Sequence, residues 1–212
     1  IGIGAGKNLN SQYNTLVGSY AGQNSSDGEH NILMGMYAGM GNSGERSLFI
    51  GNRSGMNNTG DDNLFMGYRA GENNSSGTSN VFIGNNAGLS NNVGFRNVFI
   101  GDQAGKENQS GYFNVFIGSA GGHNNGHRNI FIGDVAGEMN TTGYENVYVG
   151  DSAGRMNTVG WHNVFLGQSS GRDNTTGYFN TFIGGYSGRR NTTGWMNTFA
   201  GKAAGYYNES GK

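Results

Sequence analysis

The chain of 212 residues contains no cysteine and no proline. Without thiols it forms no disulfide bond and offers no thiolate as a nucleophile or metal ligand. Charged residues make up 13% of the sequence, and acidic and basic residues almost cancel to a formal net charge of −1. This balance argues against a protein that binds nucleic acid or a membrane surface through its charge. No apolar run reaches the about 18 residues of a membrane-spanning helix, so we expect no membrane insertion of this segment.

Glycine, in contrast, occurs 42 times and marks a repeat. The pattern Asn–aliphatic–Phe–Ile–Gly–x–x–Ala–Gly returns about every 17 residues along the whole chain. In each copy a first glycine closes the apolar triplet, a second glycine follows, and a third precedes the next Asn. A fixed period kept from end to end is typical of stacked repeats and not of a compact enzyme fold.

Some copies of the repeat are only 15 or 16 residues long. We assign all the missing residues to the segment between the second and third glycines, which is short in 122–126 and long in 137–143. Surface loops accept changes of length, whereas packed backbone does not. The sequence therefore predicts that this segment is an exposed turn.

Each apolar triplet, of which Val81, Phe82 and Ile83 are an example, combines β-branched and aromatic residues before a glycine, as short strands do. Stacking of these strands predicts an all-β fold, a parallel β-roll (β-solenoid) of about 12–13 coils with 15–17 residues per coil. We expect residues 1–212 to form a single repeat domain. Because the sequence starts and stops inside a repeat, we also expect it to be a segment of a longer fibre protein.

Side chains alternate along a strand, so the central aromatic residue faces one side and the two aliphatic residues face the other. A strand that is apolar on both faces is expected to be buried on both. The returning chain of a narrow roll covers one face, and a closed homotrimer covers the other, with phenyl rings packed between subunits. Burial of one Phe stabilises by roughly 1.5–3 kcal/mol. The aromatic column, as a trimer interface or a core ladder, consists of Phe49, Phe65, Phe82, Phe99, Phe116, Phe131, Tyr148, Phe165, Phe182 and Phe199.

An asparagine stands four residues before almost every first glycine. Stacked Asn side chains can hydrogen-bond along the axis of a parallel stack. The expected ladder consists of Asn80, Asn97, Asn114, Asn129, Asn146, Asn163, Asn180 and Asn197.

These motifs resemble a known group of repeats. The Asn-x-x-Ile-Gly core is similar to the head repeats of trimeric autotransporter adhesins, which are left-handed parallel β-rolls. The longer form at residues 180–194, Asn-Thr-Phe-Ile-Gly followed by Asn-Thr-Thr-Gly, looks like repeats of bacterial and phage tail-fibre-type proteins. The resemblance covers nearly the whole chain and implies a left-handed, trimeric, extracellular fibre or adhesin stalk. Phe occupies the central strand position where adhesin heads usually carry a small residue.

Enzymatic function is not expected. A catalytic site needs unlike groups that converge in one pocket, whereas repeats place like groups in columns. The four histidines have neither metal-ligand nor triad spacing, and the hexapeptide helix of acyltransferases would need three aliphatic anchors per coil. We therefore expect no catalytic residue and no cofactor. Asp102, Asp134 and Asp151 share a column that could bind Ca²⁺, but we expect a solvated column and no metal.

One possible ligand site is a column that changes from polar to aromatic halfway along the chain. Trp and Tyr beside Arg can stack on sugars or bind acidic glycans. The alternative is that these rings stack on one another and seal an edge between chains. The residues concerned are Tyr144, Trp161, Tyr178, Trp195, Arg155, Arg172 and Arg189.

Several turns match glycosylation acceptor motifs, but Asn, Ser and Thr are also ordinary turn residues, and we expect turns. The asparagines concerned are Asn24, Asn74, Asn140, Asn174 and Asn191.

The sequence thus favours a structural shaft or head segment of an extracellular trimeric fibre or adhesin, on a cell surface or a virion. Its partners would be copies of itself and a host-surface glycan or protein, and no nucleic acid. The alternative function is a glycan-binding adhesin module that uses the aromatic and Arg columns. The receptor, the source and the anchoring domains stay open.

Overall fold

The structure, a computed structural model, describes residues 1–211. Within this range it contains twelve strands of three residues each and no helix. The strands are β1 (Thr15–Val17), β2 (Ile32–Met34), β3 (Leu48–Ile50), β4 (Leu64–Met66), β5 (Val81–Ile83), β6 (Val98–Ile100), β7 (Val115–Ile117), β8 (Ile130–Ile132), β9 (Val147–Val149), β10 (Val164–Leu166), β11 (Thr181–Ile183) and β12 (Thr198–Ala200). Every strand coincides with an apolar triplet of the repeat.

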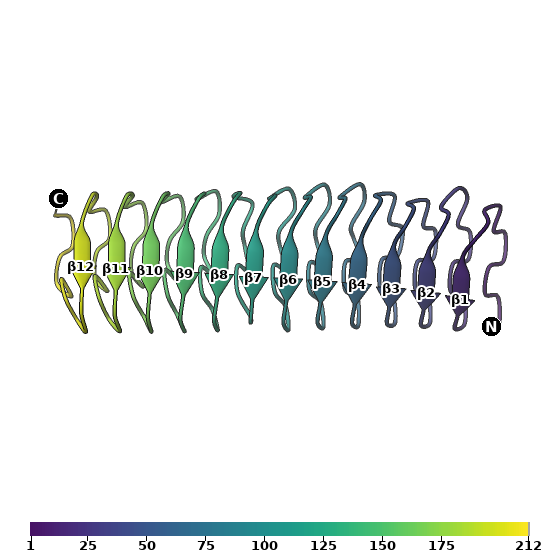
Figure 1. Ribbon diagram of the computed structural model, residues 1–212, viewed down its shortest axis with the longest axis horizontal. Helices are drawn as coiled ribbons and strands as arrows, with labels where there is room; N and C mark the ends of the chain where they lie inside the picture. The colour runs from purple at the N-terminus through teal and green to yellow at the C-terminus, as the bar shows by residue number, and fades with distance from the viewer. Residues whose placement is uncertain (212) are drawn as a thin grey trace. The chain divides into compact units, whose positions relative to one another are not determined.

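The chain divides into two compact units, Ile1–Ser110 and Gly111–Lys212. The first holds β1–β6 and the second β7–β12 (Figure 1). In each unit every strand pairs in parallel with the next strand in sequence, and the central residues of the triplets stand opposite one another. Each unit is therefore a parallel β-solenoid in which one coil contributes one strand, which confirms the expected all-β solenoid. Left-handedness and the trimer stay predictions.

The aromatic column lies inside the coil of the same chain. Phe82 and Phe99 are fully buried and stack with their ring centroids 4.9 Å apart. Opposite them the chain turns at the second glycine of the repeat, where Gly88 has φ +57° and a Cβ would lie 2.5 Å from the Phe82 ring. The buried Ala87 precedes that glycine. The expectation that phenyl rings pack between subunits is thus wrong, because the small Ala-Gly corner lets the chain cover its own rings.

The outward face of each strand is not covered by the chain. The first and third residues of the triplets lie half-buried or exposed on this face. Ile32, Met66 and Ile183, for example, retain 43%, 39% and 46% of their accessible surface. Burial of both strand faces is therefore not reached within one chain.

Two corners of most coils use left-handed backbone at residues other than glycine. Gln103 (φ 57°) and Arg96 (φ 53°) occupy these corners in one coil. The amide of Gln103 donates to the carbonyl of Asn85 (2.8 Å), and that of Arg96 donates to the carbonyl of Thr78 (3.0 Å), both in the preceding coil. The hydrogen bonds between coils compensate for a conformation that is unfavourable for these side chains.

The coil that runs from Gly118 to Gly133 is the shortest. The prediction that all its missing residues fall between the second and third glycines is wrong. Gly121, with φ +63°, packs under the Phe116 ring as second glycines do, so the corner glycine is Gly121 and not Gly122. One missing residue therefore falls between the first and second glycines. The absent residue is the left-handed one, whose counterpart in the next coil is Val135 (φ 46°). Length changes are not confined to the turn before the third glycine.

Candidate functional site

The expected asparagine ladder lies buried beside the strands. In one link of this ladder the amide of Asn80 donates to Oδ1 of Asn63 at 3.0 Å, and Nδ2 of Asn80 donates to the carbonyl of Gly94 at 2.9 Å. The same contacts recur along each unit, for example between Asn163 and Asn180. Each side chain therefore bonds both to its neighbour in the ladder and to the carbonyl of a third glycine.

A second asparagine ladder runs through the segment that the sequence predicts to be an exposed turn. Nδ2 of Asn74 donates to Oδ1 of Asn58 (2.6 Å) and to the carbonyl of Gly77 (2.8 Å). Oδ1 of Asn74 in turn accepts from Nδ2 of Asn91 (2.5 Å). The members of this ladder are Asn42, Asn58, Asn74, Asn91 and Asn108 in the first unit and Asn124, Asn140, Asn157, Asn174, Asn191 and Asn208 in the second.

The signal for the second ladder was present in the sequence. Each of these asparagines stands three residues after the glycine that packs on the aromatic column, as Asn124 follows Gly121. Four of the five glycosylation candidates, Asn74, Asn140, Asn174 and Asn191, belong to this ladder and are fully buried. Their amides are therefore inaccessible in the folded chain. The fifth, Asn24, is exposed.

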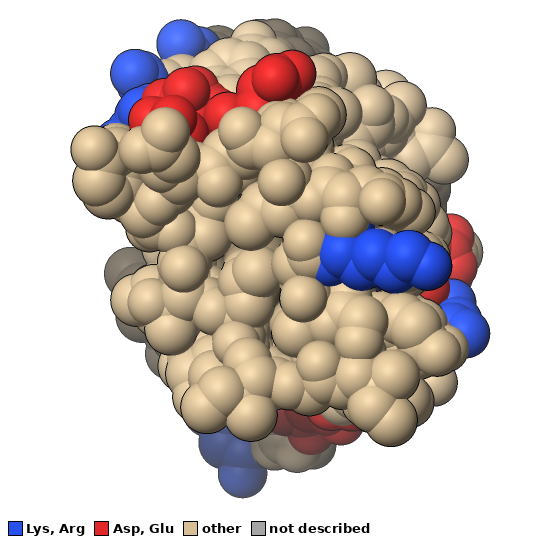
Figure 2. Space-filling model, turned by 90° about the vertical axis from the view of Figure 1, so that its right-hand side faces the viewer, with Lys and Arg blue, Asp and Glu red and all other residues tan. Residues whose placement is uncertain are grey.

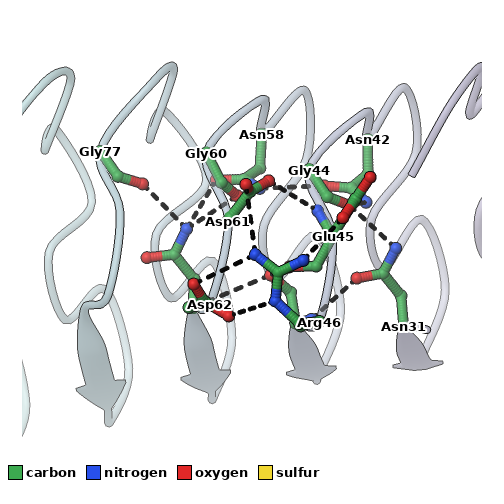
Figure 3. Close-up of polar contacts among 12 residues, drawn as sticks. Asn31, Asn42, Gly44, Glu45, Arg46, Asn58, Gly60, Asp61, Asp62 and Gly77 are labelled. Atoms are coloured by element: carbon green, nitrogen blue, oxygen red, sulfur yellow. Dashed lines mark hydrogen bonds and ion pairs between the residues drawn. The ribbon is translucent and has the colours of Figure 1, made fainter. Parts of the chain in front are cut away.

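The two ladders meet at the third glycine of each coil. The carbonyl of Gly77 accepts from Asn74 and from Asn63, both at 2.8 Å, and Nδ2 of Asn63 also donates to Oδ1 of Asn58 (3.3 Å). Figure 3 shows the same arrangement nearer the N-terminus, where the side chains of Asn31 and Asn42 both donate to the carbonyl of Gly44. A buried amide costs little when its donors and acceptors are paired, and so this interior is stabilised by polar contacts.

The aromatic residues that were candidates for glycan binding stack on one another. Ring centroids lie 5.7 Å apart for Tyr144 and Trp161, 4.9 Å for Trp161 and Tyr178, and 5.7 Å for Tyr178 and Trp195, with interplanar angles of 12° or less. Tyr144 also stacks on His127 (5.1 Å). Both faces of Tyr144, Trp161 and Tyr178 are thus occupied by neighbouring rings. A sugar that stacks on an aromatic ring needs a free face, so this arrangement favours the self-stacking alternative.

A further aromatic residue, not singled out from the sequence, lies at the same corner of the second unit. Phe179 is exposed, stacks on His162 (5.1 Å) and meets Trp161 edge-on (4.6 Å). Nε2 of His162 lies 2.7 Å from Oε2 of Glu145. These contacts extend the aromatic edge to a second column.

The three arginines of the predicted column contact side chains outside the aromatic ladder. Nε of Arg155 pairs with Glu138 (2.7 Å), and Nε of Arg172 pairs with Asp173 (3.4 Å). Arg189 donates to the hydroxyl of Tyr206 (2.7 Å). The guanidinium groups therefore pair with acidic side chains or with a tyrosine hydroxyl, and not with the rings of the aromatic ladder.

The densest charge in the first unit surrounds Arg46. Its guanidinium lies 2.6 Å from Glu45, 2.7 Å from Asp62 and 3.4 Å from Asp61 (Figure 3). The hydrogen bond from Arg46 lowers the pKa of the Asp62 carboxyl below its usual value. All four side chains are exposed, and exposed ion pairs stabilise little. On the face in Figure 2, acidic and basic side chains adjoin in a few separate places and most of the surface is uncharged.

A cavity of about 240 Å³ opens where the turn lengthens by one residue from one coil to the next. It is lined by Met56, Asn57, Glu72, Asn73, Asn74 and Ser75. The carboxylate of Glu72 is almost fully buried and is paired with Arg69 and with Arg53, the latter at 3.5 Å. Each oxygen of this carboxylate is therefore already engaged by one guanidinium group.

Within residues 1–211 no three His, Asp or Glu side chains group as metal ligands would, and no helix there is long and apolar enough to cross a membrane. Asp102, Asp134 and Asp151 all lie exposed on the surface of their units.

Comparison with known proteins adds no identification: no family model, no curated protein and no solved structure matches the chain.

Proposed function

We propose that this chain is a structural segment, a shaft or head, of an extracellular trimeric fibre or adhesin. Its role is mechanical, and it holds an attachment site away from a cell or particle surface without performing catalysis.

The observation that carries this proposal is the continuity of bonding along the coil axis within each unit. Coil joins to coil through parallel strand pairing, through two asparagine ladders and through stacked phenyl rings. Each coil contacts only its neighbours, as in other solenoids, so the structure extends by repetition. Such bonding suits an element that transmits load, whereas a catalyst needs unlike groups that converge.

The resemblance to adhesin heads and tail-fibre repeats supports the trimer and the extracellular location. The half-exposed aliphatic residues of the strands support assembly independently, because long exposed apolar stripes mark interaction surfaces. The glycan-binding alternative finds less support, since the faces of Tyr144, Trp161 and Tyr178 are covered by other rings.

Sedimentation equilibrium of the purified chain tests the proposal. We expect a species of three times the chain mass of 22.4 kDa at micromolar concentration, visible as rods by negative-stain electron microscopy. A monomer at these concentrations would overturn the trimeric fibre.

A glycan array with the same protein tests the alternative. We expect no binding that depends on Trp161. Binding that is lost in Trp161→Ala while the mass is unchanged would favour the adhesin module instead.

A further inference from the structure

The outward strand face forms two unbroken columns in each unit, which we call the aliphatic face. In the second unit it consists of the first and third residues of β7–β12, such as Val115 and Ile117 in β7 and Val164 and Leu166 in β10. All these residues are partly or largely exposed, and only Thr181 and Thr198 are polar. The corresponding residues of β1–β6 form the same face in the first unit, with Thr15 as the one polar member.

The size of the aliphatic face fits an interface. The face contains twelve side chains per unit, and each of them keeps a substantial part of its surface accessible. Together they expose roughly several hundred Å² of apolar area, whereas a stable interface buries about 800 Å² per partner. Monomeric proteins rarely leave so long an apolar stripe in water.

The regular spacing of the side chains on the aliphatic face indicates which partner can cover it. One pair of aliphatic side chains returns at each coil, and parallel strands are spaced by about 4.8 Å. A partner that fills such a face along its length must offer apolar side chains at the same spacing. A second copy of this chain does so with the same residues.

The sizes of these side chains also indicate whether the copies lie parallel or antiparallel. In β5, β6, β7, β10 and β11 the first residue of the triplet is smaller than the third, as Val164 is smaller than Leu166. Parallel copies related by rotation bring the first column of one chain against the third column of the next. Antiparallel copies would set large against large and small against small. Well-packed cores alternate large and small residues across facing positions, and so the parallel arrangement packs better.

We propose that the aliphatic face is the contact between copies of this chain, which lie parallel and in register. The inference rests on the proposed trimer and adds which side chains form it. It moves the interface from the phenyl rings, which the chain buries itself, to the aliphatic residues on either side of them.

Single cysteines test the proposal cleanly, because the chain has none of its own. Ile117→Cys, Val149→Cys and Ile183→Cys place one thiol in β7, β9 and β11 of the same column. Thr193→Cys, on an exposed turn, is the matched control. Each full-length variant is treated with a bismaleimide whose reach is shorter than two coil spacings, and its mass is checked by sedimentation beforehand.

We expect intersubunit cross-linking of similar yield at all three strand positions and a yield at least tenfold lower at Thr193→Cys. Cross-linking at only one strand position would overturn the parallel arrangement, because antiparallel copies bring like residues together only near their two-fold axis. A trimer without cross-links on the aliphatic face would overturn this inference and leave the proposed function intact. A monomeric wild-type chain would overturn both.

Discussion

Asn73 and Asn74 are neighbours with opposite environments. Asn73 is exposed, whereas Asn74 is fully buried and links Asn58, Gly77 and Asn91. We expect Asn74→Ala to lower the free energy of unfolding by about 2–3 kcal/mol, because it leaves buried partners with fewer hydrogen bonds. Asn73→Ala should change it by less than about 0.5 kcal/mol. Urea denaturation measures both, and equal midpoints would contradict the buried ladder.

Tyr148 is the one tyrosine in the aromatic column, stacked between Phe131 and Phe165 at 4.8 Å each. Its hydroxyl is buried near Asn163 without a hydrogen bond of normal geometry. Removal of an unpaired buried hydroxyl loses no bond, so Tyr148→Phe should leave stability at neutral pH unchanged or raise it by about 1 kcal/mol. Thermal unfolding at pH 7 measures this difference, and a large loss of stability would show that the hydroxyl is well bonded.

The same residue gives a pH dependence. Burial raises the pKa of Tyr148 well above its usual value of 10.0. Above pH 10 the unfolded chain releases this proton while the folded chain retains it. The free energy of unfolding should therefore fall with rising pH, by up to about 1.4 kcal/mol per pH unit from this group. Unfolding measured between pH 9 and about 11 should show a steeper loss in wild type than in Tyr148→Phe, and parallel curves would refute the assignment.

At the residue scale, regular spacing predicts the asparagine ladder beside the strands but does not show that the turn asparagines form a second one. Asn is common both in turns and in buried stacks, so its identity alone does not separate the two. The sequence pattern also does not predict whether the phenyl rings point into the coil or away from it. Alternation shows that Phe82 and its aliphatic neighbours face opposite sides, yet it does not say which side the rest of the coil covers.

At the scale of the element, the corner that closes each coil requires glycine where the chain packs on the aromatic column. Gly188 has φ +56°, and a Cβ there would overlap the Phe182 ring. Gly185, three residues earlier in the same coil, has no positive φ, and the nearest atom to its Cβ would be the Gln168 carbonyl oxygen at 3.9 Å. The two glycines therefore form a matched pair.

We expect Gly188→Ala to destabilise the chain by about 3 kcal/mol or more, since it combines a left-handed backbone with a clash in the core. Gly185→Ala should be neutral or stabilise by up to about 1 kcal/mol, because alanine restricts the unfolded chain. Guanidinium denaturation of both variants gives the comparison. Similar losses in the two would mean that the ring does not pack on the second glycine.

The strands themselves were fully predictable, because three β-formers before a glycine recur at a fixed period. The corners were not. Left-handed backbone at Gln103 or Arg96 leaves no mark on residue type, since hydrogen bonds between coils and not the side chains hold it. For the same reason the loss of one corner residue before Gly121 could not be told from a shorter turn.

At the scale of the whole molecule, a solenoid coil that buries one column of side chains leaves the other strand face to a partner. The sequence predicts that association is needed, because each strand is apolar on both sides. The sequence does not show which strand face contacts the partner, because that depends on which face the rest of the coil covers. Charge has little part in this association, because the net charge is −1 and ion pairs such as Arg46–Asp62 and Arg155–Glu138 lie within one unit. We therefore expect assembly to be insensitive to salt and governed by burial of aliphatic surface.

If assembly contributes to folding stability, the melting temperature must depend on protein concentration, because a partner that binds only the folded state shifts unfolding by mass action. We expect the melting temperature of the wild-type chain to rise by several degrees over a hundredfold increase in concentration. In Leu166→Glu a charge would have to be buried between copies, so this variant should melt at a lower temperature that does not change with concentration. Thr176→Glu, on an exposed turn, is the control and should follow the wild type. Differential scanning calorimetry at several concentrations measures all three, and a wild-type melting temperature independent of concentration would show that each chain is stable alone with its aliphatic face in water.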